Sequence, residues 1–238
     1  MSDWKVIDEL FMSALESRKR PVAVSFLDTP PVGIAAFKGV EPAGCSFWRM
    51  AAEGKSFYTV PADHYNCPIG SHTHNIPLPA EQADELGATL AMMSDLGYLS
   101  MDEVPGIPQL PQTPEAVVYT PLAETPVDPD VVLVVGRPGK IMLLQEAAIA
   151  AGYPQPTALL ARPTCMALPM SVGGAIVAST ACVGNRVYTD LGDDEVYLSI
   201  PGRYVPAIAE RIPTILAANA ALCAHHQQKA KMRAASGE

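Results

Sequence analysis

The chain passes twice through one pattern, in which a cysteine opens a helical stretch, a short apolar strand follows, and a second cysteine precedes a glycine. The first pass runs from Cys45 to Cys67, and the second from Cys165 to Cys182. A repeated unit indicates internal duplication, and two related halves can meet about a pseudo-twofold axis. We therefore expect four of the five cysteines to come together as a site of soft ligands.

The composition is that of an acidic globular protein. The 238 residues are 49% hydrophobic, enough to bury a substantial core, and the formal net charge of −9 argues against a nucleic-acid surface. The N-terminal helix lacks the apolar core of a signal peptide, and the apolar runs are only as long as strands. We therefore expect a cytoplasmic protein without a membrane segment, whose thiols are free or bind a metal.

Hydrophobic periodicity predicts a mixed α/β domain, with mixed α+β as the alternative, built on a mixed sheet with flanking helices. Residues 1–238 form one domain of two half-repeats, at about 20–80 and 116–205. A helix at about 81–97 joins the halves, and a C-terminal helix covers about 201–233. Strands are expected at 21–28, 33–37, 56–60, 116–122, 128–136, 157–161, 175–179 and 195–200.

The spacing of the cysteines differs from that of common structural metal motifs. Zinc knuckles and ferredoxin-type clusters use cysteines a few residues apart, whereas Cys45 and Cys67, like Cys165 and Cys182, are well separated in the chain. The fold must therefore assemble a shared site from one ligand per loop. The alternative is that each cysteine is a small buried hydrophobic residue.

Two glycines and two methionines accompany the cysteines. Gly70 and Gly184 free the backbone to turn and to point N–H groups at sulfur, which would tune the potential of a bound cluster. Met166 and Met170 flank the helix of Cys165, where they either fill the core or line a soft-metal or haem pocket.

Three of the five histidines lie in one polar segment bounded by Pro61 and Pro77: His64, His72 and His74. His72 and His74 are two residues apart, so on an extended strand both imidazoles would face the same side, as a metal or a haem edge requires. These histidines are candidates for an additional ligand or a proton donor. Alternatively, they satisfy the backbone of their own loop.

Several ordered motifs run through the chain: PVAVSFLD, NCPIG, DPDVVLVVGRPGKIMLLQEAAI, RPTCMALPM and STACVGNRVYTDLGDDEVYLSIPG. Together they resemble the domain of unknown function 169 family, from roughly Pro21 to Ile212. The family has no assigned activity. The resemblance implies that the four cysteines of the repeated pattern, here called the four paired cysteines because each half contains two, are a family feature. It also implies that the segment DHYNCPIGSHTHNIPLP is an elaboration of a subgroup.

Three functions fit these residues. In the first, the four paired cysteines hold an iron–sulfur cluster or another thiophilic metal between the halves of a redox protein. In the second, Cys67 is the nucleophile of a metal-free enzyme, activated by His64 or His72. In the third, the histidine-rich loop binds haem or another tetrapyrrole. A redox partner or a small-molecule ligand is expected, and the crossing near Pro105 to Pro114 is either a flap or the contact of a homodimer.

Overall fold

A mixed β-sheet forms the centre of the molecule, for which the computed structural model describes residues 3–236. Its strands are β1 (Val22–Leu27), β2 (Phe57–Thr59), β3 (Ala116–Pro121), β4 (Val131–Gly136), β5 (Thr157–Leu159), β6 (Val177–Ser179) and β7 (Val196–Pro201). They lie in the order β2-β3-β1-β4-β7-β6-β5. Neighbouring strands are antiparallel except for the parallel pair β5–β6. The predicted mixed α/β class is confirmed.

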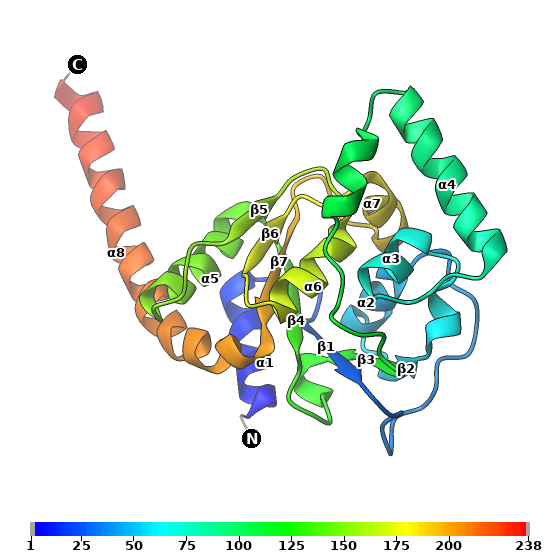
Figure 1. Cartoon of the computed structure of the whole chain (residues 1–238). Helices are drawn as coiled ribbons and strands as arrows, with labels where there is room; N and C mark the ends of the chain where they lie inside the picture. Colours follow the sequence, from blue (N-terminus) through cyan, green and yellow to red (C-terminus); the bar gives the residue numbers. More distant parts are fainter. Residues whose placement is uncertain (1–2, 237–238) are drawn as a thin grey trace.

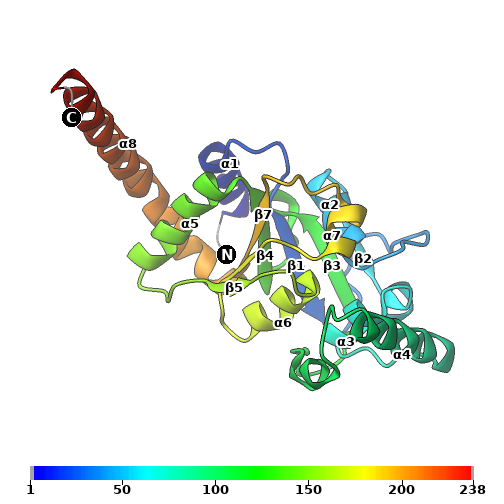
Figure 2. The same ribbon diagram turned by 90° about the horizontal axis from the view of Figure 1, so that it is seen from above.

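Helices cover both faces of this sheet (Figures 1 and 2). On one face lie α1 (Trp4–Leu15), α5 (Pro138–Ala150) and the first turns of α8 (Val205–Ser236). On the other face lie α2 (Cys45–Ala52), α3 (Pro68–Thr73), α6 (Ala167–Val172) and α7 (Val183–Thr189), and α4 (Ala80–Asp95) lies outside them. Short 3-10 helices complete the chain: η1 (Pro61–His64), η2 (Met101–Gly106), η3 (Leu122–Glu124), η4 (Thr164–Met166) and η5 (Gly202–Tyr204).

Strand β4 shows why the sequence of a central strand is apolar throughout. Val132 and Val134 pack with α1, α5 and α8, whereas Val131, Leu133 and Val135 face the opposite core. Successive side chains of a strand point to opposite faces, so a sheet covered on both sides needs apolar residues at every position.

The two halves of the chain have corresponding topologies. The order β1-α2-β2-α3-β3 in the first half matches β4-α6-β6-α7-β7 in the second, once α4, α5, β5 and the 3-10 helices are set aside. The pairings match as well, because β1–β3 and β3–β2 correspond to β4–β7 and β7–β6, and all four are antiparallel. The antiparallel pair β1–β4 joins the halves. This arrangement agrees with two related halves, while their origin by duplication stays a prediction.

One expected strand is wrong. Residues 33–37 form only an isolated bridge, between Ala36 and Tyr58. Pro30 and Pro31 precede this segment, and Gly33 has a φ of 85°, a left-handed conformation outside the range of strands. The other expected strands are confirmed, α4 lies where the linking helix is expected, and α8 lies where the C-terminal helix is expected.

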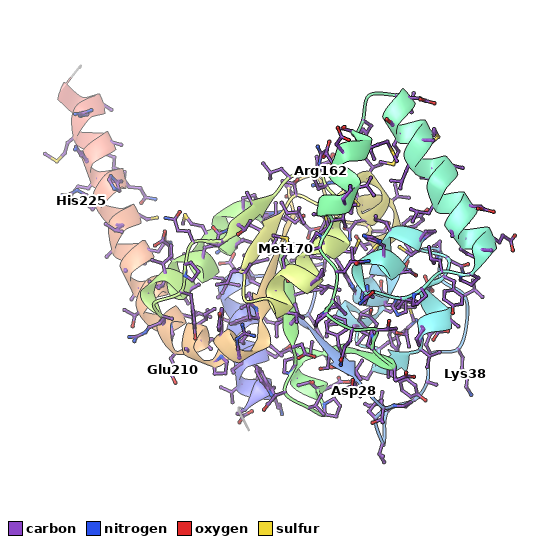
Figure 3. All side chains as sticks on the ribbon, viewed as in Figure 1. Asp28, Lys38, Arg162, Met170, Glu210 and His225 are labelled. Atoms are coloured by element: carbon purple, nitrogen blue, oxygen red, sulfur yellow. The ribbon has the colours of Figure 1, made fainter. Side chains whose placement is uncertain are left out.

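Helix α8 begins in the core and then extends beyond the body of the molecule (Figures 1 and 3). Val205, Ile208 and Ile212 are buried, whereas His225 is exposed on the projecting part. Among the described residues, the helical stretch Gly202–Ala234 is long and apolar enough to cross a membrane by length and composition, a test that core helices also pass. It meets that test although the sequence contains no long continuous apolar run, because alanines raise its mean hydropathy.

Candidate thiol site

The four paired cysteines stand where helices begin on one face of the sheet. Cys45 is the first residue of α2, and Cys67 is the N-cap of α3. Cys165 lies in η4, which leads into α6, and Cys182 is the N-cap of α7. Each half of the chain therefore contributes two thiols, each from the start of a different helical segment. The fifth cysteine is exposed on α8 and takes no part.

The four thiols are close enough to act on one another electrostatically. Burial, together with the neighbouring Cys67 and Cys182, raises the pKa of Cys45 to about 12. Burial also raises the pKa of Cys165 well above its usual range, and the other three thiols raise it further. The pKa of Cys67 is raised by burial first and by Cys182 to a smaller extent. Without a bound metal, these three thiols are neutral at pH 7.

Hydrogen-bond donors surround the sulfur atoms. The backbones of Gly44 and Gly70 hydrogen-bond to Cys67, which opposes the rise in its pKa. The backbone N–H of Asn185 donates to Sγ of Cys182 over 3.5 Å, and the Asn185 side chain interacts with Cys45. Such donors stabilise a thiolate and, around a bound cluster, adjust its reduction potential.

The two predicted glycines have different roles. At Gly70, a Cβ atom would lie 2.8 Å from Sγ of Cys67, which is too close for two non-bonded atoms. Only glycine at this position allows the sulfur to stay where it is. At Gly184, a Cβ atom would meet only Cε2 of Tyr188, at an ordinary 3.7 Å. The backbone N–H that donates to the Cys182 sulfur is that of Asn185 and not that of Gly184. Gly70 is therefore the glycine whose lack of a side chain the thiol arrangement requires.

Tyr119 of β3 places a polar atom beside the thiols. Its side chain is fully buried, and its hydroxyl has no hydrogen-bond partner among the described residues. Burial raises its pKa well above the usual range, and Cys67, Cys45 and Cys165 raise it further. A buried hydroxyl without a partner is unfavourable by about 1 to 3 kcal/mol. The hydroxyl is thus a donor available to a group held by the thiols.

An apolar shell encloses the thiols on the side of the sheet. Aromatic and aliphatic side chains from α2, α6, β3 and β7 make up this core, and Cys45 and Cys165 pack against it. Its large members are Phe47, Trp48, Tyr119, Leu168 and Tyr197. A shell of this kind limits the access of water to a metal centre and lowers the local dielectric constant.

Two of the three candidate histidines lie buried next to each other behind this site. Nε2 of His64 lies 2.8 Å from Oγ1 of Thr59, and Nδ1 of His74 lies 2.7 Å from the carbonyl oxygen of Gly70. The two ring centroids are 5.1 Å apart. Burial lowers the pKa of His64 well below its usual range and that of His74 to about 4. Both imidazoles are therefore neutral at pH 7.

His72 does not share a face with His74, contrary to the arrangement expected on a strand. The segment is helical, because α3 runs to Thr73 and His74 is its C-cap, and residues two apart on a helix do not face each other. Nδ1 of His72 instead accepts a hydrogen bond of 3.1 Å from Nε2 of Gln109. The imidazole of His64 pairs with Thr59 and that of His72 with Gln109, and among the described residues neither ring is hydrogen-bonded to the Cys67 thiol. The contact between His64 and Cys67 is a backbone one, in which the N–H of Cys67 donates to the carbonyl oxygen of His64 over 2.9 Å.

The thiols are gathered but not arranged for a single ion. Within residues 3–236, no group of three or more His, Cys, Asp or Glu side chains is positioned to hold one metal ion. Single-ion sites need sulfur atoms about 2.3 Å from a common centre. The four thiols do not form such an arrangement in the described part of the chain.

Two neighbours of the thiols could not be predicted from the sequence. Tyr119 lies in an apolar strand and Asn185 in a short helix, so neither carries a pattern that marks it as part of a site. Met166 and Met170 both pack against the small core formed around Val177, and Met166 also lines a cavity beside the thiols.

Comparison with known proteins agrees with the motifs found in the sequence. A family model described as "Uncharacterised ArCR" (DUF169) matches residues 10–211, which include all four paired cysteines and both halves of the sheet. No curated protein and no solved structure matches the chain. The extent of the family match shows that the chain belongs to the domain of unknown function 169 family.

Proposed function

We propose that this protein is a redox protein in which Cys45, Cys67, Cys165 and Cys182 hold an iron–sulfur cluster between the two halves. One observation carries the proposal: four thiols from four separate helix starts gather on one face of the sheet, two from each half. Four cysteine thiolates are the common ligand set of [2Fe–2S] and [4Fe–4S] clusters.

A cluster can join thiols that do not surround a single ion. They interact electrostatically, yet among the described residues they do not form a group positioned for one ion. A cluster separates its protein ligands by its own iron and sulfide atoms. Its thiolates are consequently farther apart than those around one zinc ion.

The surroundings of the thiols also suit an anionic, sulfur-rich group. Backbone donors at Gly44, Gly70 and Asn185 reach the sulfurs of Cys67 and Cys182, and the Tyr119 hydroxyl has no other partner in the described part of the chain. A bound cluster would accept these hydrogen bonds. The thiols would lose their protons on binding iron. In the loaded site, the buried neutral thiols would become thiolates whose charge is balanced by iron.

A cluster would supply electron transfer, and the protein would bind it, tune its potential and keep water away. The apolar shell around Phe47 and Leu168 limits solvent on the side of the sheet. His64 and His74, neutral and buried, remain the candidates for a proton donor or an additional ligand.

The two other functions have less support. A cysteine nucleophile needs a lowered pKa or an adjacent base, whereas burial raises the pKa of Cys67 and the histidines have other partners. Haem ligation by His64 or His74 would require the structure to open, because these side chains are 0% and 2% exposed. A cytoplasmic location, a redox partner and a homodimer stay part of the proposal.

Removing one cluster ligand should remove the cluster. Protein purified without oxygen should contain iron and acid-labile sulfide and show broad charge-transfer absorption. We expect Cys67→Ser to lose most of both and Cys223→Ser to retain them, because Cys223 is exposed on α8. Metal analysis and absorption spectra test this. A colourless, iron-free wild-type protein, or equal iron in both variants, would contradict the proposal.

A matched pair of glycine variants tests the geometry. Gly70→Ala should force the Cys67 sulfur to move, because the new Cβ would lie 2.8 Å from it, whereas Gly184→Ala has room. Both positions are helical, so the backbone accepts alanine at each. We expect the iron content to fall at least severalfold in Gly70→Ala only. Equal iron in the two variants would show that Cys67 is not held at the cluster.

Tyr119→Phe should change the potential of the cluster and not its amount. The variant loses a hydroxyl that would donate to the cluster or to a ligand sulfur, and such hydrogen bonds favour the reduced state. We expect wild-type iron content with a more negative midpoint potential in a spectroscopic redox titration. An unchanged potential would show that the hydroxyl does not reach the cluster.

A further inference from the structure

A large cavity lies directly beside the thiol site. Its volume is about 870 Å³, and both Cys67 and Cys182 line it. The starts of α3 and α7 and the segment before α6 form one side, and α4 with η2 forms the other. Cavities of roughly 300 to 1,000 Å³ hold most small-molecule ligands and cofactors. The space is thus large enough for a substrate-sized molecule.

The wall that α4 contributes to the cavity is mostly apolar, although Glu85 and Thr89 also lie in it. No residue of α4 is buried, and the helix contacts only α3 and η2 among the described elements to any extent. Leu86, Leu90 and Met93 nevertheless line the cavity at helical spacing. These side chains face the cavity and do not pack against a core. A helix that turns such a stripe toward a cavity is stabilised when an apolar molecule fills it.

Sulfur and aliphatic groups make up much of the remaining wall. Ile69 of α3, Met166 of η4 and Val183 of α7 surround the two cysteines, and Val104 and Ile107 lie opposite them in and after η2. Polar groups are few. The lining resembles that of sites for hydrocarbon-rich ligands, in which a few polar groups orient the molecule.

The charges of the lining argue against an anionic ligand, and its largely apolar surface argues against a charged ligand of either sign. Arg162 forms an ion pair of 2.8 Å with Glu103 of η2, and Figure 3 shows Arg162 beside that segment. Glu85 of α4 also lies in the lining. The cation is thus already paired, and no second cation among the lining residues is available for an anionic ligand. The ion pair also links the α4–η2 segment to the body of the protein.

The α4–η2 segment is an addition to the shared topology of the halves. It lies between α3 and β3, and the corresponding connection from α7 to β7 contains no helix. It therefore forms a cover over one side of the thiol site that the other half does not repeat.

We propose that this cavity binds an uncharged, largely hydrocarbon or aromatic small molecule, with α4 and η2 as its cover and Cys67 and Cys182 at its floor. The binding of such a molecule is inferred from the size and lining of the cavity alone. That the bound molecule would lie against a redox centre rests on the proposed function. The ligand would then be the molecule with which the centre reacts or the one that regulates it.

The test uses Nile red, an uncharged lipophilic dye, and two neighbouring residues of α4. Met93 lines the cavity, whereas Met92 is 55% exposed and does not. The full-length wild-type protein and the Met93→Asp and Met92→Asp variants are purified without oxygen. Bound dye is measured by ultrafiltration and extraction, so quenching by a metal centre does not affect the result. Iron is measured in the same samples, and circular dichroism checks the fold.

We expect about one bound dye per wild-type chain, unchanged in Met92→Asp and at least about tenfold weaker in Met93→Asp, because a carboxylate in an apolar cavity is costly to desolvate. No binding, or equal binding by both variants, would overturn the inference even if iron is present, and would favour a protein segment as the occupant. Dye binding that depends on Met93 in iron-free protein would support the cavity and contradict the cluster.

Discussion

The antiparallel pairing of β1 with β4 is the interaction on which the rest of this structure depends. Val22, Ala23 and Val24 pair with Leu133, Val132 and Val131 at the centre of the sheet. Each half of the chain extends outward from this pair with the same sequence of pairings. A shift of register by one residue would turn every side chain of a strand to the other face. The pairing therefore determines that the cysteine-bearing helices of both halves lie on one face.

The burial of the thiol site determines the protonation of its cysteines and the hydrogen bonding of Tyr119. The apolar shell keeps Cys45, Cys67 and Cys165 neutral by raising their pKa values, and it leaves the Tyr119 hydroxyl without a partner among the described residues. The unpartnered hydroxyl is unfavourable, whereas the thiols are neutral because burial penalises their ionised form. A metal centre would replace the protons and accept the free hydrogen bond. Binding of the centre would thereby also stabilise the fold.

Much of the framework could be predicted from the sequence because it rests on local patterns. The repeated order of helix, strand and cysteine predicted which thiols lie near one another, and continuous apolar runs predicted β3 and β4. The predicted strand at 33–37 is wrong because a positive φ at Gly33 interrupts it. The expected alignment of His72 with His74 is wrong because their segment is helical.

The parts that could not be predicted depend on long-range packing. Tyr119 reaches the thiols because β3 lies between β1 and β2, and strand order cannot be derived from local patterns. The cavity was missed for a different reason. Leu86, Leu90 and Met93 form an apolar stripe at helical spacing, which is the usual sign of a helix packed on a core. Only the structure shows that this stripe covers a cavity.

The central claim is that four cysteine sulfurs surround one iron–sulfur cluster, and iron X-ray absorption tests it most directly. The measurement would use full-length protein purified without oxygen. We expect a first shell of sulfur around iron, together with a second shell of iron neighbours at the short distance of a sulfide-bridged cluster. A shell of nitrogen or oxygen atoms, sulfur without iron neighbours, or the absence of iron from the protein would contradict it.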